Sequence, residues 1–129
     1  MGTKASELEQ RNAPRRSLAV PFRMMTSGRV PQTIDGETID VSARGLGIKF
    51  GRGKSLGIDS LLEGLVEDRV GVEVTLRLPQ GSVSVHGQIM WWGLLGDDER
   101  FAMRAGVLLR DGWSEADWKL IEENLRTAG

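Results

Sequence analysis

Three arginines, Arg11, Arg15 and Arg16, stand close together near the start of this 129-residue sequence, in the stretch "EQRNAPRRSLAVPFRM". Crowded guanidinium groups repel one another unless an anion or a flat partner lies between them. Arginine can clamp a phosphate, or the O6 and N7 edge of guanine, with paired hydrogen bonds. The cluster therefore indicates either a local anion site or a solvated basic tail, and the rest of the chain must decide between them.

A second group of polar residues lies in the stretch "IDVSARGLGIKF". Asp40 and Ser42 are two residues apart at the end of an expected strand, so their side chains should emerge on the same face. A carboxylate can accept the paired N–H donors of guanine, and a hydroxyl beside it can donate or accept. Gly45 permits a turn or a close approach to the backbone. Taken alone, these residues also fit an ordinary turn between two strands.

The elements that would position these residues are mostly β-strands. Alternation of apolar and polar residues predicts strands at 18–24, 45–50, 70–79, 82–92 and 101–109, with another that ends near Ile39. A short helix is expected at 58–68. Within the strand 82–92, period two places Trp91 on the apolar face and Trp92 on the other. An outward tryptophan could stack on a nucleobase or pack under a helix, and we favour the helix.

The end of the chain has the pattern of an amphipathic helix at about 114–127. Ser114 is a candidate N-cap, and Trp118, Ile121 and Leu125 share one helical face. The fold class predicted is therefore all-β with a terminal helix, a small antiparallel six-stranded β-barrel capped by that helix. We expect residues 1–10 to form a flexible N-terminal arm and residues 11–129 to form a single domain.

Composition excludes several classes of function. With 17 basic and 18 acidic residues, the net charge is −1, so no global field attracts DNA or RNA. The chain has no cysteine and one histidine, His86, which argues against a metal site. No nucleophile and base stand together, so we expect no catalytic residues. No apolar run is long enough to insert into a membrane, and no signal peptide is evident, which predicts a cytoplasmic protein.

Taken together, "RNAPR" at 11–15 and "DVSARG" at 40–45 resemble the RxxxR and [D/N]xSxxG motifs of PilZ domains, bacterial receptors for cyclic di-GMP. The resemblance covers nearly the whole chain, because the order of motifs, barrel strands and terminal helix also agrees. A second RxxxR at 100–104 shows that this motif alone is weak. The two motifs in the correct order carry more weight.

The resemblance implies a PilZ-like split barrel that binds cyclic di-GMP and needs no other cofactor. It assigns Arg11 and Arg15 to guanine and phosphate, Asp40 and Ser42 to guanine, and Gly45 to backbone geometry. Two further residues, Arg16 and Arg44, could contact the ligand or face solvent.

With no output domain in the sequence, such a receptor would act on an unidentified protein effector. The main alternative is an interaction module of the same fold that does not respond to nucleotide. A small barrel that binds single-stranded nucleic acid through arginines and aromatic residues is a weaker one, because the net charge is near neutral.

Overall fold

The computed structural model describes residues 14–27, 32–51, 58–95 and 101–128. Within these ranges the elements follow one another as β1 (Arg16–Ser17), β2 (Pro21–Thr26), β3 (Thr33–Val41), β4 (Gly45–Phe50), α2 (Ile58–Glu67), β5 (Gly71–Leu78), β6 (Gly81–Leu94), β7 (Met103–Leu109) and α3 (Glu115–Ala128). The arm expected at 1–10 and Arg11 lie outside the described residues.

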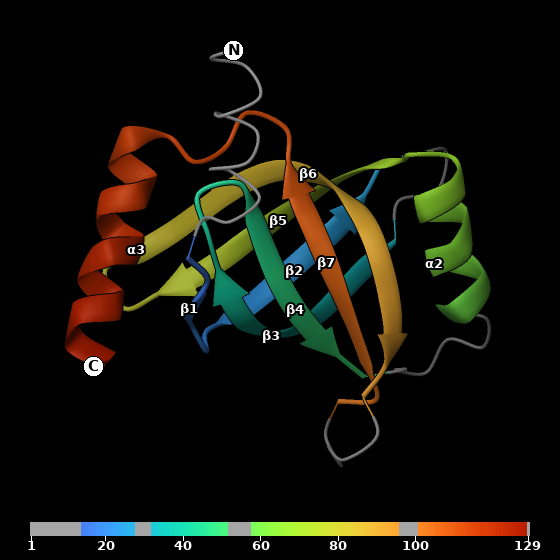
Figure 1. Ribbon diagram of the computed structural model, residues 1–129, viewed down its shortest axis with the longest axis horizontal. Helices are drawn as coiled ribbons and strands as arrows, with labels where there is room; N and C mark the ends of the chain where they lie inside the picture. Colours follow the sequence, from blue (N-terminus) through green and yellow to red (C-terminus); the bar gives the residue numbers. More distant parts are fainter. Residues whose placement is uncertain (1–13, 28–31, 52–57, 96–100, 129) are drawn as a thin grey trace.

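The strands form a closed antiparallel barrel (Figure 1). The order is β1-β3-β2-β5-β6-β7-β4, and an additional pairing between β3 and β4 closes a ring of six strands. The short β1 pairs with the end of β3, where Arg16 lies opposite Val41 and Ser17 opposite Asp40. Closure pairs each of the six strands on both sides, which removes the exposed edges of an open sheet. The predicted six-stranded barrel with a C-terminal helix is confirmed.

Alternating side chains fill the barrel. Along β5 every second residue is buried, from Val72 to Leu78, as period two requires. The predicted first strand, 18–24, differs: β2 begins only at Pro21. The reason is the buried Thr38, whose hydroxyl oxygen accepts a hydrogen bond from the Val20 amide at 2.9 Å and donates to the Leu18 carbonyl. Two backbone hydrogen bonds still link this segment to β3, from the Leu18 amide to the Ile39 carbonyl and from the Thr38 amide to the Val20 carbonyl. The Thr38 side chain thus inserts into an otherwise paired segment.

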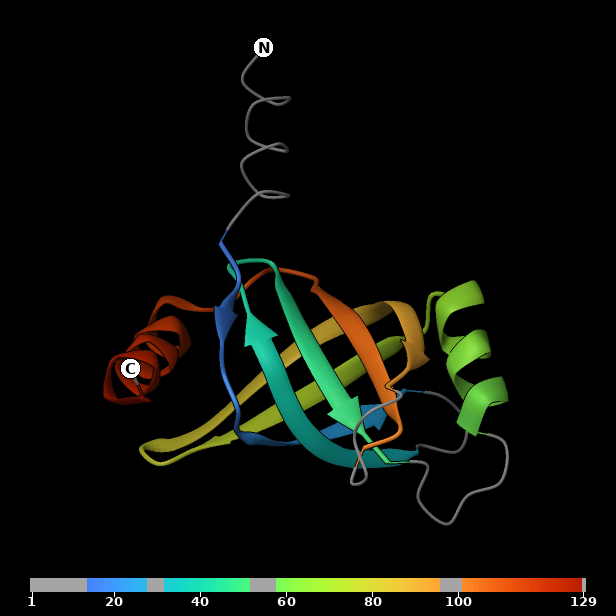
Figure 2. The same ribbon diagram turned by 60° about the horizontal axis from the view of Figure 1, so that its bottom comes forward.

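The two described helices lie at opposite ends of the barrel (Figures 1 and 2). α3 begins as the sequence predicts, because the Ser114 hydroxyl accepts the Asp117 amide at 3.1 Å. Ile121 and Leu125 are buried in the core, and Trp118 packs partly against it, so the predicted apolar face is confirmed. Neither described helix is long and apolar enough to cross a membrane.

Candidate functional site

Arg15 and Asp40 meet on the outside of the barrel. Arg15 precedes β1, Asp40 lies near the end of β3, and the guanidinium Nη1 donates to the carboxylate Oδ1 at 2.8 Å. The arginine side chain is 52% exposed and the aspartate side chain 28% exposed. An ion pair this open to water adds little to stability, on the order of 0–1 kcal/mol. Its value here is that it holds two groups of opposite charge at one place on the surface.

A β-bulge aims Asp40 outward. Thr38 pairs with Ile48 and Asp40 pairs with Gly47, so Ile39 is an extra residue in β3. Simple alternation from the buried Thr38 would turn Asp40 into the barrel. The extra residue reverses the faces, so that Val41 is buried and Asp40 faces outward beside Gly47. Bulges are known to redirect side chains in this way near functional sites.

Ser42 lies in a short turn that is fixed from two sides. Its amide donates to the Gly45 carbonyl at 3.0 Å, and its own carbonyl accepts from the indole Nε1 of Trp113 at 2.9 Å. Ser42 is buried, and a Cβ added at Gly45 would lie 3.5 Å from its Oγ and 3.6 Å from Arg15 Nη2. Arg15, Asp40, Ser42 and Gly45 are therefore brought together, with Trp113 bracing the turn.

A row of outward positions runs from Asp40 across the barrel. Asp40 lies opposite Gly47, Gly47 opposite Gly106, and Gly106 opposite Trp91. A Cβ at Gly47 would lie 2.5 Å from Asp40 Oδ1, and a Cβ at Gly106 would overlap the indole nitrogen of Trp91. Both glycines are buried, because the Asp40 carboxylate lies over Gly47 and the Trp91 indole lies over Gly106. The two glycines thus let these side chains lie flat along the strands. The row spans three strand spacings, roughly 14 Å, which suits a flat ligand.

The placement of Trp91 corrects the sequence analysis. Ile89 pairs with Val107 and Trp91 with Gly106, so Met90 is an extra residue in β6. This second bulge reverses the faces after Ile89. Trp91 is 45% exposed on the outside, whereas Trp92 packs partly against the core. The outward tryptophan lies on the row that contains Asp40, and not under a helix as favoured above.

Arg104 adds a positive charge at the far end of this row. Its guanidinium carbon lies 5.6 Å from the centre of a Trp91 ring, within the range of a cation–π contact. Arg15 and Arg104 therefore stand at opposite ends of the glycine-lined row. The sequence analysis set Arg104 aside with the second RxxxR stretch, because its alignment with Trp91 depends on the register of β6 and β7.

The remaining candidates lie elsewhere or outside the described residues. Arg16 is exposed in β1, opposite Val41. Arg44 is exposed, and its side chain lines a different pocket together with Arg69 and Arg110. No cluster of three potential metal ligands occurs among the residues that the structure describes.

Gly47, Gly106, Trp91 and Trp113 were missed as contributors to the site. One signal was available for Gly47, since it stands two residues after Gly45 on the same face of its strand. Trp113 carries no local signal of its role, because it follows the last strand and only the fold brings it next to Ser42.

Comparison with known proteins supports the fold. No family model and no curated protein matches this sequence at a significant level. Solved structures do match: the Bacillus subtilis inhibitor of motility MotI/DgrA, at 12% identity and a TM-score of 0.60, is matched over 91% of this chain and 50% of its own. This chain thus spans about half the length of that protein.

Two isolated domains match over nearly their whole length. One is the PilZ domain of CeSA from a cellulose-synthesizing bacterium, at 14% identity and a TM-score of 0.55, covering 91% of this chain and 100% of the other. The other is the PilZ domain of YcgR from Escherichia coli with cyclic di-GMP, at 15% identity and a TM-score of 0.57, covering 92% and 97%. The resemblance seen in the two motifs is confirmed for the fold: the chain has the closed barrel and terminal helix of PilZ domains.

Proposed function

We propose that this protein is a cytoplasmic, non-enzymatic receptor for cyclic di-GMP, which binds along the row from Asp40 to Trp91. The observation that carries the proposal is the Arg15–Asp40 pair, held at 2.8 Å at one end of a strip of outward glycines. The PilZ-fold structure of YcgR with cyclic di-GMP adds support, since it shows that a barrel of this architecture can hold the nucleotide.

The chemistry of each end of the row matches one part of the ligand. The Asp40 carboxylate accepts hydrogen bonds only, and the Watson–Crick edge of guanine offers adjacent N–H donors. Arg15 can fork onto guanine O6 and N7 or onto a phosphate. Because the two groups already pair with each other, both are positioned at the row before the nucleotide arrives. Arg11, by the motif, joins Arg15 in this clamp.

The middle and far end of the row suit the flat parts of the ligand. Gly47 and Gly106 leave room for the Asp40 carboxylate and the Trp91 indole to lie close to the barrel surface, where a larger residue would displace them. The indole of Trp91 can stack on the second base, which is worth about 1–3 kcal/mol. Arg104, which lies over the same indole, places a second guanidinium where it can meet a phosphate. Ser42 and Gly45 shape the turn that carries this arrangement.

The response to the ligand would be read by another protein. Arg15 directly precedes β1, and Trp113, which hydrogen-bonds to the turn at Ser42, lies just before α3. The proposed ligand contacts are therefore linked to both the first and the last described segments of the chain. Closing of Arg11 and Arg15 on the nucleotide would change the surface offered to an effector. Arg16 and Arg44 are placed outside the row and are not needed for this proposal.

Calorimetric titration of cyclic di-GMP into the purified protein tests the proposal, with GTP and cyclic di-AMP as specificity controls. We expect selective binding that falls about tenfold or more in Arg15→Ala and Asp40→Ala, because each removes a charged hydrogen bond of about 1.5–3 kcal/mol. Arg77→Ala is the matched control, since this exposed arginine of β5 lies outside the row.

Two results would contradict the proposal. The first is a well-folded protein that gives no heat with cyclic di-GMP, which would instead favour a PilZ-fold interaction module without nucleotide response. The second is binding that Arg15→Ala and Asp40→Ala leave unchanged, because the row from Asp40 to Trp91 would then not be the site.

A further inference from the structure

A second group of arginines lies outside the proposed cyclic di-GMP site. Arg44, Arg69 and Arg110 line one pocket of about 170 Å³. They come from three parts of the chain: the turn between β3 and β4, the junction of α2 and β5, and the residue after β7. None of the three side chains has a hydrogen bond or an ion pair among the described residues. Three arginines in one pocket, with no acidic partner in the part of the chain that the structure describes, favour the binding of an anion.

Arg69 occupies a position where arginine is unfavourable. The Val70 amide donates to the Leu65 carbonyl and the Arg69 amide to the Val66 carbonyl, which is the hydrogen-bond pattern that ends a helix with one left-handed residue. Arg69 is that residue, with φ of 52°, and glycine is preferred there. Local backbone preference therefore does not explain the arginine. Its guanidinium is what distinguishes it from glycine, and it lines the pocket.

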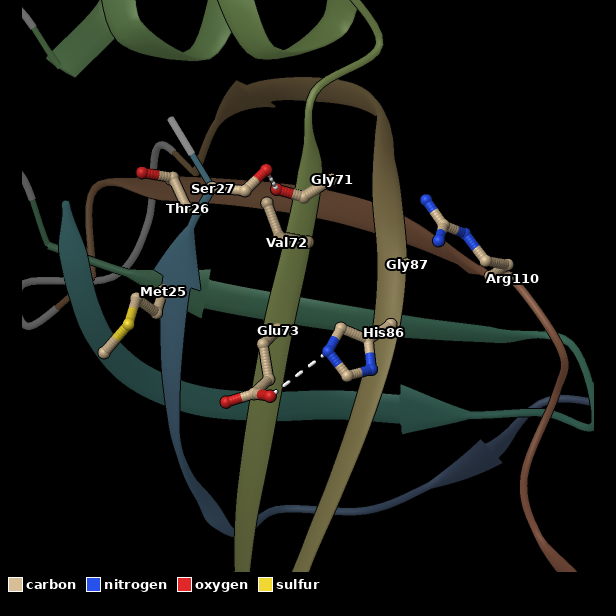
Figure 3. A pocket seen from close by; sticks show the side chains of 9 residues that line it. All are labelled: Met25, Thr26, Ser27, Gly71, Val72, Glu73, His86, Gly87 and Arg110. Atoms are coloured by element: carbon tan, nitrogen blue, oxygen red, sulfur yellow. Dashed lines mark hydrogen bonds and ion pairs between the residues drawn. The ribbon is translucent and has the colours of Figure 1, made fainter. Parts of the chain in front are cut away.

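The pocket adjoins a larger and less polar one. Arg110, Gly71 and Gly87 belong to both, and the second pocket has a volume of about 290 Å³ (Figure 3). Figure 3 shows Arg110 beside β6, with its guanidinium group pointing toward that strand, and a Cβ at Gly71 would lie 3.9 Å from its Nη2. Met25 and Val72 supply apolar lining, while Glu73 and His86 pair with each other at 3.2 Å. Space for an organic group thus opens beside the three arginines.

We infer that this is a second binding site, which takes a diphosphate group on Arg44, Arg69 and Arg110 with its organic part over Gly71. Three guanidinium groups offer more hydrogen-bond donors than one carboxylate can accept, because a single arginine already binds both carboxylate oxygens. A diphosphate offers more oxygens and more charge. The inference does not rest on the proposed cyclic di-GMP site, since neither Arg15 nor Asp40 lines this pocket.

Nuclear magnetic resonance titration with inorganic pyrophosphate and with ADP, at constant ionic strength, tests the inference. Adenine lacks the guanine edge that suits Asp40, so ADP is a selective probe of the second site. We expect saturable shifts of the Gly71, Gly87 and Arg110 amides with both compounds, and tighter binding of ADP because its nucleoside has space to occupy. Sulfate at the same ionic strength should produce at least tenfold weaker shifts.

Two variants separate binding from folding. Arg69→Gly removes a cation but places the preferred residue at the left-handed position, so the melting temperature should stay the same or rise while affinity falls about tenfold. Arg110→Ala should have a similar effect on affinity, and Arg77→Ala should have none. Arg15→Ala should leave ADP binding within twofold, whereas cyclic di-GMP binding should survive Arg69→Gly. The two sites can thus fail independently.

Several results would overturn the inference. Shifts centred on Gly45 and Gly47 would place the anion at the other site, and equal shifts with sulfate would mean general screening. Unchanged ADP binding in both Arg69→Gly and Arg110→Ala would exclude these arginines. Weaker binding of ADP than of pyrophosphate would remove the role given to the adjoining pocket.

Discussion

Two sides of the same barrel use their outward positions differently. Where the first part of β3, β2, β5 and the first half of β6 lie side by side, polar side chains face one another directly across the strands. Arg23 pairs with Asp35, Thr75 with Ser84, and Glu73 with His86. The hydrogen bond to Asp35, together with its charge, raises the pKa of Arg23. Each of these groups meets its partner within the protein.

The other side is formed by the end of β3, β4, β7 and the second half of β6. It keeps one cross-strand ion pair, between Glu37 and Lys49 at 3.9 Å, but differs in its backbone. Its outward row has glycine at 47 and 106, and both bulges of the barrel occur in the strands that flank these glycines. Bulges and outward glycines weaken a sheet locally, by up to about 1 kcal/mol for each glycine. The comparison teaches that regular cross-strand pairing marks the first side, whereas bulges and outward glycines mark the side that carries the proposed cyclic di-GMP site.

The largest expected effect on stability comes from Gly36, a glycine that packing inside the barrel requires and that lies outside the proposed ligand site. A Cβ at Gly36 would overlap the Lys49 carbonyl oxygen and press on the Phe22 ring. Gly36→Ala should therefore lower the free energy of unfolding by about 3 kcal/mol, at the upper end for overpacking. Chemical denaturation measures this loss. Gly64→Ala is the control: nothing lies near that site in α2, and alanine should stabilise the helix by about 0.5–1 kcal/mol.

A glycine on the ligand side should behave differently. In Gly47→Ala the new methyl group meets the Asp40 carboxylate, a movable side chain, so we expect a stability loss below about 1 kcal/mol. Cyclic di-GMP affinity should fall about tenfold, because the new methyl group displaces the Asp40 carboxylate from its place over Gly47. Calorimetry and denaturation on one sample compare the two quantities. If Gly47→Ala lost as much stability as Gly36→Ala, the distinction between the two sides would be wrong. Gly93→Ala, at an open position in β6, is the binding control.

An intermediate effect is expected where the ligand side is braced. Trp113→Phe removes the indole donor that bonds the Ser42 carbonyl at 2.9 Å. The loss should be about 1 kcal/mol of folding stability, with weaker cyclic di-GMP binding because the turn at Ser42 is less well held. Thermal unfolding with and without nucleotide reports both. Trp118→Phe serves for comparison, since no hydrogen bond from its indole holds the turn.

The smallest effect should come from the regular side. Thr75→Ala removes the hydroxyl that meets Ser84 across β5 and β6 at 2.9 Å. Cross-strand pairs of this kind contribute about 0.2–1 kcal/mol, so denaturation should show a loss in that range. Nucleotide binding should not change. A marked loss of binding in this variant would show that the regular side also takes part in ligand recognition.

The sequence predicts the barrel well because its signals are local. Alternation along β5 and the capped, one-sided pattern of α3 survive in the structure almost unchanged. The site was only partly predictable. The motif identifies Asp40 in the sequence. Its outward direction, however, depends on the bulge at Ile39, and this bulge is defined only by the pairing of β3 with β4. The same holds for Trp91, whose face is set by the extra residue Met90.

Other parts of the site depend on pairing between distant strands. Gly47 and Gly106 become neighbours only through the register of β4 and β7, and period two along either strand alone does not reveal it. Trp113 reaches Ser42 across a sequence separation that no local pattern encodes. Local patterns therefore give the strands and the motif, while the shape of the ligand surface comes from strand register.

Closure of the barrel by the β3–β4 pairing has a mechanical consequence. A ring in which every strand is bonded on both sides is stiff, so a ligand that settles on its surface has little capacity to bend it. A conformational change on binding would instead occur in segments that make few contacts with the barrel. These are β1, which is two residues long, and the segment from Arg110 to Ser114 that leads into α3. If the proposed ligand binds, the barrel would serve as a rigid support, and any rearrangement would be concentrated in the two chain segments beside it.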